Sequence, residues 1–328
     1  MARGTEPARG AAEPAVIGVD VGGTKVAAAR IAGTEVIDPV VHPTDLSGSD
    51  ALLAGIESAI REVGERSGAP EAVGIGMPSQ IDFATGTIVS SVNIPFEGVA
   101  LGEELTARIG VPVYLDNDAN CAALAEAQFV EDAPAQHLVM LTLGTGVGGG
   151  VVIGGRIFRG ASGLGAELGH TVIDPDGPEC PGSCPNRGCL EALASGTALE
   201  REATARAGGE RVKGKQVVEA ARNGDAGAQE LLRDLARWLG IGISNFVNVF
   251  EPAHFVIGGG LSAAADLFLS DAVEEAQSRA LPALFERVRV SVAKAGNDAG
   301  VIGAGLLAAQ ELSLKGDTAG LASDGRSA

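Results

Sequence analysis

Two stretches of the chain repeat the same order of apolar residues and glycines. The first, AVIGVDVGGTKVAAARIAG, starts at Ala15 and reads as two apolar strands joined by a glycine turn. The second, LVMLTLGTGVGGGVVIGGRI, starts at Leu138 and has the same form. Because one pattern recurs about a domain's length apart, the chain is predicted to contain two related α/β halves rather than a short-period solenoid.

The rest of the chain alternates between the periodicities of helices and strands. Segment 111–128 passes from a strand into a helix, and segment 254–262 is a strand and a glycine turn, followed by a helix to about Arg279. Segment 226–249 is expected to be a core helix with a broad apolar face formed by Leu231, Leu235, Leu239, Phe246 and Phe250. The remaining expectations are helices over 50–67, 102–109, 195–221 with a glycine interruption and 299–312, strands over 72–77 and 288–293, and a polar loop over 78–98.

Composition limits the classes of partner. A chain of 328 residues with 45% apolar residues can fill two cores of ordinary size. Its formal net charge of −18 argues against nucleic acids and anionic membranes, which bind basic surfaces. The first fifteen residues lack the apolar stretch of a secretory signal, and no apolar run is long enough to span a membrane. Four cysteines, three of them clustered, do not suit a disulfide framework and favour a reducing cytoplasm.

Glycine-rich turns follow three of the apolar strands. In DVGGTK, Gly22 and Gly23 have no side chains, so backbone N–H groups can approach an anion, and Thr24 and Lys25 add a hydroxyl and a positive charge. Asp20 ends the strand, where its carboxylate could hold a hydrated magnesium ion. A tight hairpin also selects glycine, so this turn alone fits a phosphate site and a purely structural turn equally well.

Two further turns favour the phosphate interpretation. Thr145 lies between Gly144 and Gly146 in LGTGVGGG, and a third glycine cluster, 258–260, follows another apolar strand. Three such turns suit a nucleotide lying across a cleft better than three unrelated hairpins. The chain lacks the pattern GxxxxGK[ST], which argues against an ordinary P-loop NTPase.

In LDNDAN, Asp116 and Asp118 flank Asn117 where a strand is predicted to run into a helix. Asn117 or Asp118 lies where the N-cap is expected, and helix capping is the simplest interpretation of Asp116. Asp118 is the candidate for chemistry, because phosphoryl transfer to an alcohol needs a carboxylate that orients the hydroxyl and accepts its proton. This role requires Asp118 to face the glycine turns.

Side chains that hydrogen-bond sugar hydroxyls occur beside the glycine turns and the cysteine cluster. Any one of them alone fits better as a loop residue bonded to the backbone. As a set they predict a sugar pocket, and its candidate residues are Asn93, Asn117, Asp118, Glu167, His170 and Glu191.

One histidine and three cysteines predict a zinc site. His170 precedes the pattern Cys-x3-Cys-x4-Cys, formed by Cys180, Cys184 and Cys189, and these four ligands complete a tetrahedral site. Four protein ligands leave no open position for water, so the zinc is predicted to be structural. It would stiffen a loop rich in proline and glycine and hold the two flanking glutamates beside the imidazole.

The ordered motifs resemble those of the ROK family (repressors, open reading frames and kinases), and most of all its bacterial ATP-dependent glucokinases. The match runs from about Val16 to Leu312 through DVGGTK, LDNDAN, LGTGVGGG, GAELGH, GCLE, IGGGLS and GNDAG. The resemblance implies an α/β chain with the actin-like ATPase (ribonuclease H-like) fold, in which two domains close over sugar and ATP. The implied organisation is a disordered tail at 1–14, a small domain at 15–118 completed by a helix at about 299–312, a large domain at 119–298 with a zinc loop at 170–191, and a disordered tail at 313–328.

The resemblance also implies roles for particular residues. Asp118 matches the catalytic base that acts on the sugar 6-hydroxyl, and Asn117 matches a contact to neighbouring hydroxyls. Glu167, His170 and Glu191 match the groups that hold the C1 and C2 side of the sugar, with His170 also a zinc ligand, and Asn93 matches a further sugar contact. The first phosphate motif corresponds to Asp20, Gly22, Gly23, Thr24 and Lys25, the second to Gly144, Thr145 and Gly146, and the residues near the adenosine to Gly259 and Gly260.

Two segments depart from the family's usual pattern. The family usually has Cys-x-Cys-x4-Cys, whereas ECPGSC separates the first two cysteines by three residues, so the loop must bulge to keep the same ligands. In GMPSQID, Ser79 and Gln80 stand where relatives often have glycine and another residue, which leaves the choice of sugar open in that region.

Several functions remain open at this level. The first expectation is ATP- and Mg²⁺-dependent phosphorylation of glucose at O6 by a homodimer or homotetramer. The same polar groups would serve a kinase for N-acetylmannosamine, N-acetylglucosamine, fructose or allose, and polyphosphate is a less favoured donor. A sugar-responsive transcriptional regulator is disfavoured, because only about fifteen residues precede the first strand and the charge opposes DNA binding.

Overall fold

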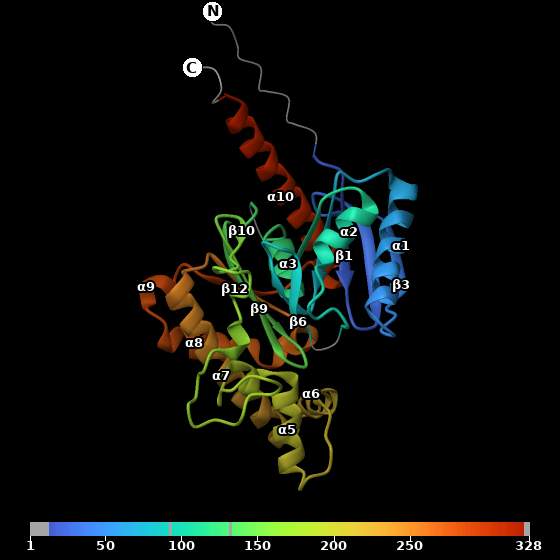
Figure 1. Cartoon of the computed structure of the whole chain (residues 1–328). Coiled ribbons are helices and arrows are strands. Elements are labelled where there is room, and N and C mark those ends of the chain that lie inside the picture. Colours follow the sequence, from blue (N-terminus) through green and yellow to red (C-terminus); the bar gives the residue numbers. More distant parts are fainter. Residues whose placement is uncertain (1–12, 92–93, 131–132, 325–328) are drawn as a thin grey trace, which may run out of the picture.

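The computed structural model describes residues 13–91, 94–130 and 133–324, and it contains two five-stranded sheets flanked by helices (Figure 1). The first sheet has the strand order β3-β2-β1-β4-β7. Neighbours among β3, β2 and β1 pair antiparallel, whereas β4 and β7 run parallel to β1. The strands are β1 (Val16–Val21), β2 (Lys25–Ala32), β3 (Glu35–Pro43), β4 (Ala72–Met77) and β7 (Val113–Asn117).

The second sheet repeats this arrangement in the order β10-β9-β8-β11-β12. Again three strands pair antiparallel and two more continue the sheet in parallel. The two related halves predicted from the sequence are therefore confirmed. The strands are β8 (His137–Leu143), β9 (Val147–Ile153), β10 (Arg156–Ile157), β11 (His254–Gly258) and β12 (Arg289–Val292).

Helices cover both faces of the first sheet. On one face lie α1 (Ser49–Ser67) and α2 (Leu101–Ile109), and α1 packs Leu52, Ile56 and Ile60 into the same apolar core as the buried side chains of β1. The four-residue spacing of these side chains places them on one face of the helix. Burial of this face is what fixes α1 against the sheet.

The opposite face of the first sheet contacts α3 (Asp118–Glu126) and α10 (Ala299–Asp324). The backbones meet directly, since a Cβ atom on Gly74 of β4 would lie 1.8 Å from the carbonyl oxygen of Ala304. A Cβ on Gly18 of β1 would likewise lie 2.0 Å from the carbonyl oxygen of Val301. The last helix of the chain therefore packs against the strands that begin it.

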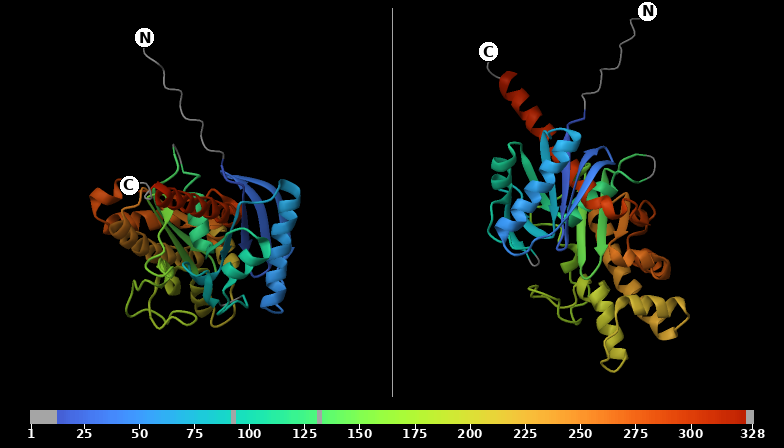
Figure 2. Two further views of the ribbon diagram at one scale, coloured as in Figure 1. Left: turned by 45° about the horizontal axis from the view of Figure 1, so that its top comes forward. Right: turned by 90° about the vertical axis from the view of Figure 1, so that its right-hand side faces the viewer.

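The helices of the second half surround one long apolar helix, α7 (Ala226–Phe250), which is the predicted core helix. The short helices α5 and α6 project at the end of the molecule opposite to α10 (Figures 1 and 2). The remaining helices are α4 (Leu190–Ala194), α5 (Gly196–Arg206), α6 (Gly214–Arg222), α8 (Leu269–Arg279) and α9 (Pro282–Phe285), with 3₁₀ turns at η1 (Leu168–His170), η2 (Gly260–Leu267) and η3 (Gly296–Asp298).

The predicted polar loop over 78–98 is wrong in part, because it contains a hairpin, β5 (Ser79–Asp82) and β6 (Thr87–Ser91). The two strands bury Ile81 and Ile88 but expose Val89, and the mostly polar residues around them hide the strand pattern. The helical segment predicted over 195–221 with a glycine interruption is confirmed as α5 and α6, whereas β3 was not expected.

The predicted closing helix is also too short. Helix α10 continues to Asp324, through most of the segment expected to be a disordered tail. Residues 1–12 and 325–328 lie outside the described residues, so most of the N-terminal tail and the last four residues stay predictions. Within the described part of the chain, none of the helices combines the length and apolarity needed to cross a membrane.

Candidate active site

Strand β7 passes directly into helix α3 at the predicted catalytic aspartate. Asn117 is the N-cap residue, and its side chain accepts a hydrogen bond from the backbone N–H of Ala119 at 2.9 Å. The Asp118 carboxylate accepts from the same N–H at 2.8 Å. Burial raises the pKa of Asp118, the hydrogen bond from Ala119 opposes this, and the negative charge of Glu167 raises the pKa further. Asp118 therefore lies within electrostatic reach of Glu167, although the two come from different halves of the chain.

A small polar cavity lies between the two halves at this point. It is lined by β5, the start of α3, the beginning of β9 and the loop 163–167. The Gln80 amide donates to Glu167 at 3.2 Å, and the Asn117 amide donates to the carbonyl oxygen of Ser79 at 3.4 Å. Asn117, Asp118 and Glu167 thus meet in one pocket, whereas His170 and Glu191, predicted as members of the same set, do not line it. Asn93, the other predicted sugar contact on this side, lies outside the described residues.

Helix α4 holds the second predicted glutamate. The Glu191 carboxylate accepts a hydrogen bond from the backbone N–H of Val147 at 2.9 Å, at the first residue of β9. A Cβ atom on Gly146 would lie 2.3 Å from Oε2 of Glu191. The turn between β8 and β9 therefore needs a glycine to admit this carboxylate.

His170, Cys180, Cys184 and Cys189 form the predicted metal cluster, with all four ligand atoms within 4.8 Å of one another. Cys184 Sγ and Cys189 Sγ are 3.8 Å apart, and Cys180 Sγ is 3.4 Å from His170 Nδ1. Zinc bonds of about 2.3 Å to sulfur and about 2.0 Å to nitrogen in a tetrahedron require separations of about 3.8 Å and about 3.5 Å, respectively. The donor set and its spacing fit zinc.

The loop itself accommodates the two extra residues between the first two cysteines. Gly182 adopts a φ of +74°, a left-handed conformation that glycine takes without strain, and this lets the loop bulge between Cys180 and Cys184. Cys189 is the N-cap residue of α4, so the metal cluster ends where the helix of Glu191 begins. The cluster thereby fixes the position of Glu191 relative to His170.

The first glycine turn joins β1 to β2. Gly22 donates from its backbone N–H to the carbonyl oxygen of Lys25 at 2.9 Å, and the Thr44 hydroxyl donates to the carbonyl oxygen of Gly22 at 2.7 Å. Gly23 and Thr24 are exposed at the tip of the turn. This leaves the tip accessible to a ligand.

Asp20 lies at the base of this turn and close to Asp118. The pKa of Asp20 is raised to about 6, mainly by burial and then by the negative charge of Asp118, with Lys25 opposing. A Cβ atom on Gly300 would lie 2.7 Å from the carboxyl carbon of Asp20, so the carboxylate lies against the first turn of α10. Two buried carboxylates that repel each other are suited to share a divalent cation.

A larger cavity of about 710 Å³ lies against the second glycine turn. Its lining includes Gly144, Thr145 and Gly260, which the sequence assigned to phosphate and adenosine binding, but not Gly146 or Gly259. The turn is tied to the start of α5, where Thr197 donates from its hydroxyl to the carbonyl oxygen of Thr145 at 2.7 Å. Lining residues that sequence reasoning missed include Thr197, Lys215, Glu219, Arg222 and Asn223, which no motif marks.

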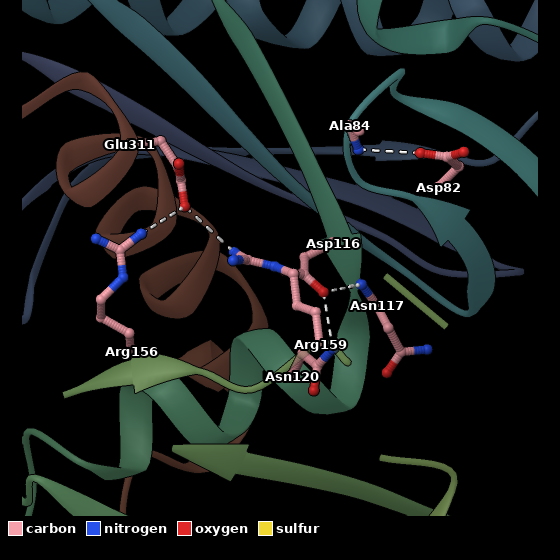
Figure 3. A network of polar contacts seen from close by, with 8 residues as sticks. All are labelled: Asp82, Ala84, Asp116, Asn117, Asn120, Arg156, Arg159 and Glu311. Carbon is pink, nitrogen blue, oxygen red and sulfur yellow. Dashed lines mark hydrogen bonds and ion pairs between the residues drawn. The ribbon is translucent and has the colours of Figure 1, made fainter. Parts of the chain in front are cut away.

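The helix-capping role expected for Asp116 is wrong, since Asn117 caps α3. Asp116 is buried with 3% of its surface exposed, and its carboxylate accepts hydrogen bonds from the Asn117 backbone, the Asn120 amide and the Arg159 guanidinium (Figure 3). Arg159 follows β10 in the other half of the chain. The ion pair between Asp116 and Arg159 could not be inferred from the sequence.

The chain is similar to sugar kinases over most of its length. A model described as ROK family matches residues 16–311. The glucokinase of Halalkalibacterium halodurans is 36% identical over 315 residues, which cover 90% of this chain and 95% of that protein. The crystal structure of the ROK hexokinase from Thermus thermophilus has a TM-score of 0.82 at 37% identity, with 91% of this chain and 99% of that chain covered. A ROK family glucokinase from Streptomyces griseus, solved in complex with glucose and AMPPNP, has a TM-score of 0.74 at 34% identity, with 90% and 99% covered.

Proposed function

Because the chain belongs to the ROK family of actin-like ATPase fold proteins, we propose that it is a glucokinase, which transfers the γ-phosphoryl group of ATP to the 6-hydroxyl of glucose. The observation that carries this proposal is the position of Asp118. It lies at a helix start in a polar cavity between the two halves, within electrostatic reach of Asp20 and Glu167.

Asp118 is the proposed general base. Phosphoryl transfer requires little covalent chemistry from the protein, so the carboxylate acts by orienting the sugar hydroxyl and accepting its proton. Burial raises its pKa, which makes the ionised form a stronger base than an exposed carboxylate. The N–H of Ala119 holds the carboxylate in place through its hydrogen bond.

The sugar is proposed to bind to groups from both halves of the chain. Asn117 and Asp118 contribute from the first half, and Glu167, His170 and Glu191 contribute from the second. Because His170 directs Nδ1 toward the zinc ligands, Nε2 is the ring nitrogen proposed to reach the sugar. The zinc is structural and fixes the loop from which these groups project.

The nucleotide is proposed to occupy the large cavity, with its phosphates between the two glycine turns. Gly144 and Thr145 line this cavity. The tip of the DVGGTK turn, which belongs to the first sheet, is exposed and therefore accessible to the phosphates. Asp20 is the proposed anchor for Mg²⁺, which when bound would neutralise charge on the transferred phosphoryl group. Burial and the negative charge of Asp118 raise the pKa of Asp20, and a bound cation would stabilise the ionised carboxylates of both residues.

Two further properties belong to the same proposal. A cytoplasmic location follows from the use of ATP and from four cysteines that form no disulfide among the described residues. A homodimer or homotetramer follows from the family resemblance, and light scattering in solution tests it.

The experiment that tests this function is a panel of sugars with ATP and Mg²⁺, with the phosphorylated product detected by mass spectrometry. Glucose is expected to give the highest kcat/KM, and polyphosphate in place of ATP serves as the second donor. A preference for N-acetylglucosamine, N-acetylmannosamine, fructose or allose would reassign the acceptor. If the protein phosphorylated no hexose and bound a DNA fragment in a salt-dependent manner, the proposed function would be that of a transcriptional regulator instead of an enzyme.

A further inference from the structure

A buried carboxylate lies directly behind the catalytic turn. Oδ1 of Asp116 accepts from the backbone N–H of Asn117 and from the side-chain amide of Asn120, both at 2.8 Å. These donors flank Asp118 in sequence, so the orientation of the turn depends on where the Asp116 carboxylate lies. Figure 3 shows this carboxylate between the end of β7 and the start of α3.

Arg159 supplies the positive charge that balances this carboxylate. Its Nε donates to Oδ2 of Asp116 at 2.6 Å, and its side chain is 13% exposed. The guanidinium also lies 3.5 Å from the carboxylate of Glu311 on α10 and 3.6 Å from the centre of the Phe83 ring beyond β5. One side chain thus contacts the ends of β7 and β5 and the last helix.

The backbone of Arg159 begins the loop that carries Glu167. Its carbonyl oxygen accepts from the N–H of Gly165 at 2.9 Å, which closes the loop on itself. The same loop packs on the hairpin, because a Cβ atom on Gly163 would lie 2.7 Å from the carbonyl oxygen of Ile81. Arg159 therefore joins the loop of Glu167 to the turn of Asp118.

This arrangement depends on a guanidinium rather than on positive charge alone. A guanidinium can donate from Nε to one carboxylate, approach a second through its terminal nitrogen and lie flat on an aromatic ring at the same time. A lysine ammonium is a point charge and can replace only one of these contacts. Removing the charge altogether would leave Asp116 buried without a counter-charge, which is strongly unfavourable.

We propose that Arg159 is a positioning residue for the sugar acceptor, acting through Asp116 on the Asn117–Asp118 turn and through its own backbone on the loop of Glu167. This inference rests on the proposed kinase function. It concerns the sugar side alone, because none of the residues that line the large cavity takes part in the contacts of Arg159 and Asp116 described above. Small displacements of a reacting group lower turnover strongly, so the expected effect is on kcat and on the KM for glucose.

The test compares Arg159→Lys and Arg159→Met with the wild-type enzyme in steady-state kinetics and thermal melting. Arg159→Lys keeps the charge and is expected to melt close to the wild-type temperature, yet to lose about tenfold in kcat/KM for glucose. Arg159→Met is expected to lose about a hundredfold and to melt at a lower temperature. For both variants the KM for ATP should stay within about twofold of the wild-type value, because the contacts they change lie on the sugar side.

Arg156 provides the matched control. It lies 3.4 Å from the same Glu311 carboxylate, but it is 43% exposed and the structure shows no contact between it and Asp116 among the described residues. Arg156→Met is expected to keep wild-type kinetic constants. If Arg159→Lys matched the wild-type enzyme in every kinetic constant, or if the KM for ATP changed as much as that for glucose, the positioning role would be wrong. Failure of the proposed function would appear separately, as a wild-type enzyme that phosphorylates no hexose.

Discussion

The carboxylate of Glu191 occupies the space that a side chain on residue Gly146 would need, with only 2.3 Å between Oε2 and the position of such a Cβ atom. Gly146 belongs to the turn proposed to bind phosphate, whereas Glu191 is proposed to bind the sugar. The two parts of the proposed site therefore touch at this point. Glycine at position 146 leaves room for the Glu191 carboxylate, and Gly146 does not line the large cavity proposed for the nucleotide.

Gly146→Ala should therefore impair sugar binding. The added methyl group displaces the carboxylate and breaks its hydrogen bond to the N–H of Val147. A hydrogen bond to a charged group contributes about 1.5–3 kcal/mol, so the KM for glucose is expected to rise by about tenfold or more. Gly144→Ala is the control, because a Cβ atom there meets nothing within 4 Å, and its KM for glucose should not change. Equal effects of both substitutions on the KM for glucose would contradict this assignment of Gly146.

Asp118→Asn should abolish turnover while glucose still binds. The amide keeps the shape of the side chain but cannot accept the hydroxyl proton, and loss of a general base lowers kcat by about 10²–10⁴-fold. Product formation measures kcat, and the rise in melting temperature with glucose measures binding. Turnover near the wild-type rate would remove Asp118 from the mechanism.

Zinc should be present at one ion per chain and should be lost from Cys184→Ser. The loop would then no longer fix His170 and Glu191, so the KM for glucose is expected to rise and the melting temperature to fall by about 5 °C or more. Elemental analysis of the purified protein measures the metal. Cys121→Ala is the control, because Cys121 is buried outside the cluster and its loss should leave the zinc content unchanged.

The stability of the ligand-free protein should depend on the ionisation of Asp20. Its pKa rises from 3.8 to about 6 on folding, so between these values the folded state binds more protons than the unfolded state. The free energy of unfolding is therefore expected to fall by about 2 kcal/mol as the pH rises from about 4 to about 6. Urea unfolding of Asp20→Asn, which cannot ionise, should lack this contribution. An unchanged slope in that variant would show that another group is responsible.

Activity should have the opposite dependence on pH, because the proposed Mg²⁺ site requires the ionised form of Asp20. Turnover is expected to be lost as the pH falls through about 6, the value to which the pKa of Asp20 is raised. Higher Mg²⁺ concentrations should move this loss to lower pH by stabilising the carboxylate. A pH profile that does not respond to Mg²⁺ would separate Asp20 from metal binding.

The features predicted correctly from the sequence are those whose residues are close along the chain. The strand and turn around Asp20 are local, and so is the zinc cluster, in which ten residues separate His170 from Cys180. The bulge needed by the two extra residues was also predictable, since Gly182 lies inside it. The assignment of sugar and phosphate contacts was carried by motifs and stays a proposal for each residue.

The contacts that could not be predicted join segments far apart in the chain. Forty-three residues separate Asp116 from Arg159, and Glu126 accepts from the backbone N–H of Ala295 across 169 residues. Nothing in the local sequence of Asp116 distinguishes a helix cap from a buried ion pair. The hairpin of β5 and β6 was missed for a related reason. Its two buried isoleucines lie among polar residues, and the hairpin packs against the loop 163–167, which is distant in sequence.

The close backbone contacts of Gly18 and Gly74 with α10 have a consequence for synthesis of the protein. The strands of the first sheet are translated before the second half, but α10, which covers one face of this sheet, is translated only after the second half. The nascent N-terminal half must therefore wait with an apolar surface uncovered, a state in which chains are prone to aggregate. Completion of the first half therefore depends on translation of the second half, because this one helix belongs to the first sheet but follows the second in the sequence.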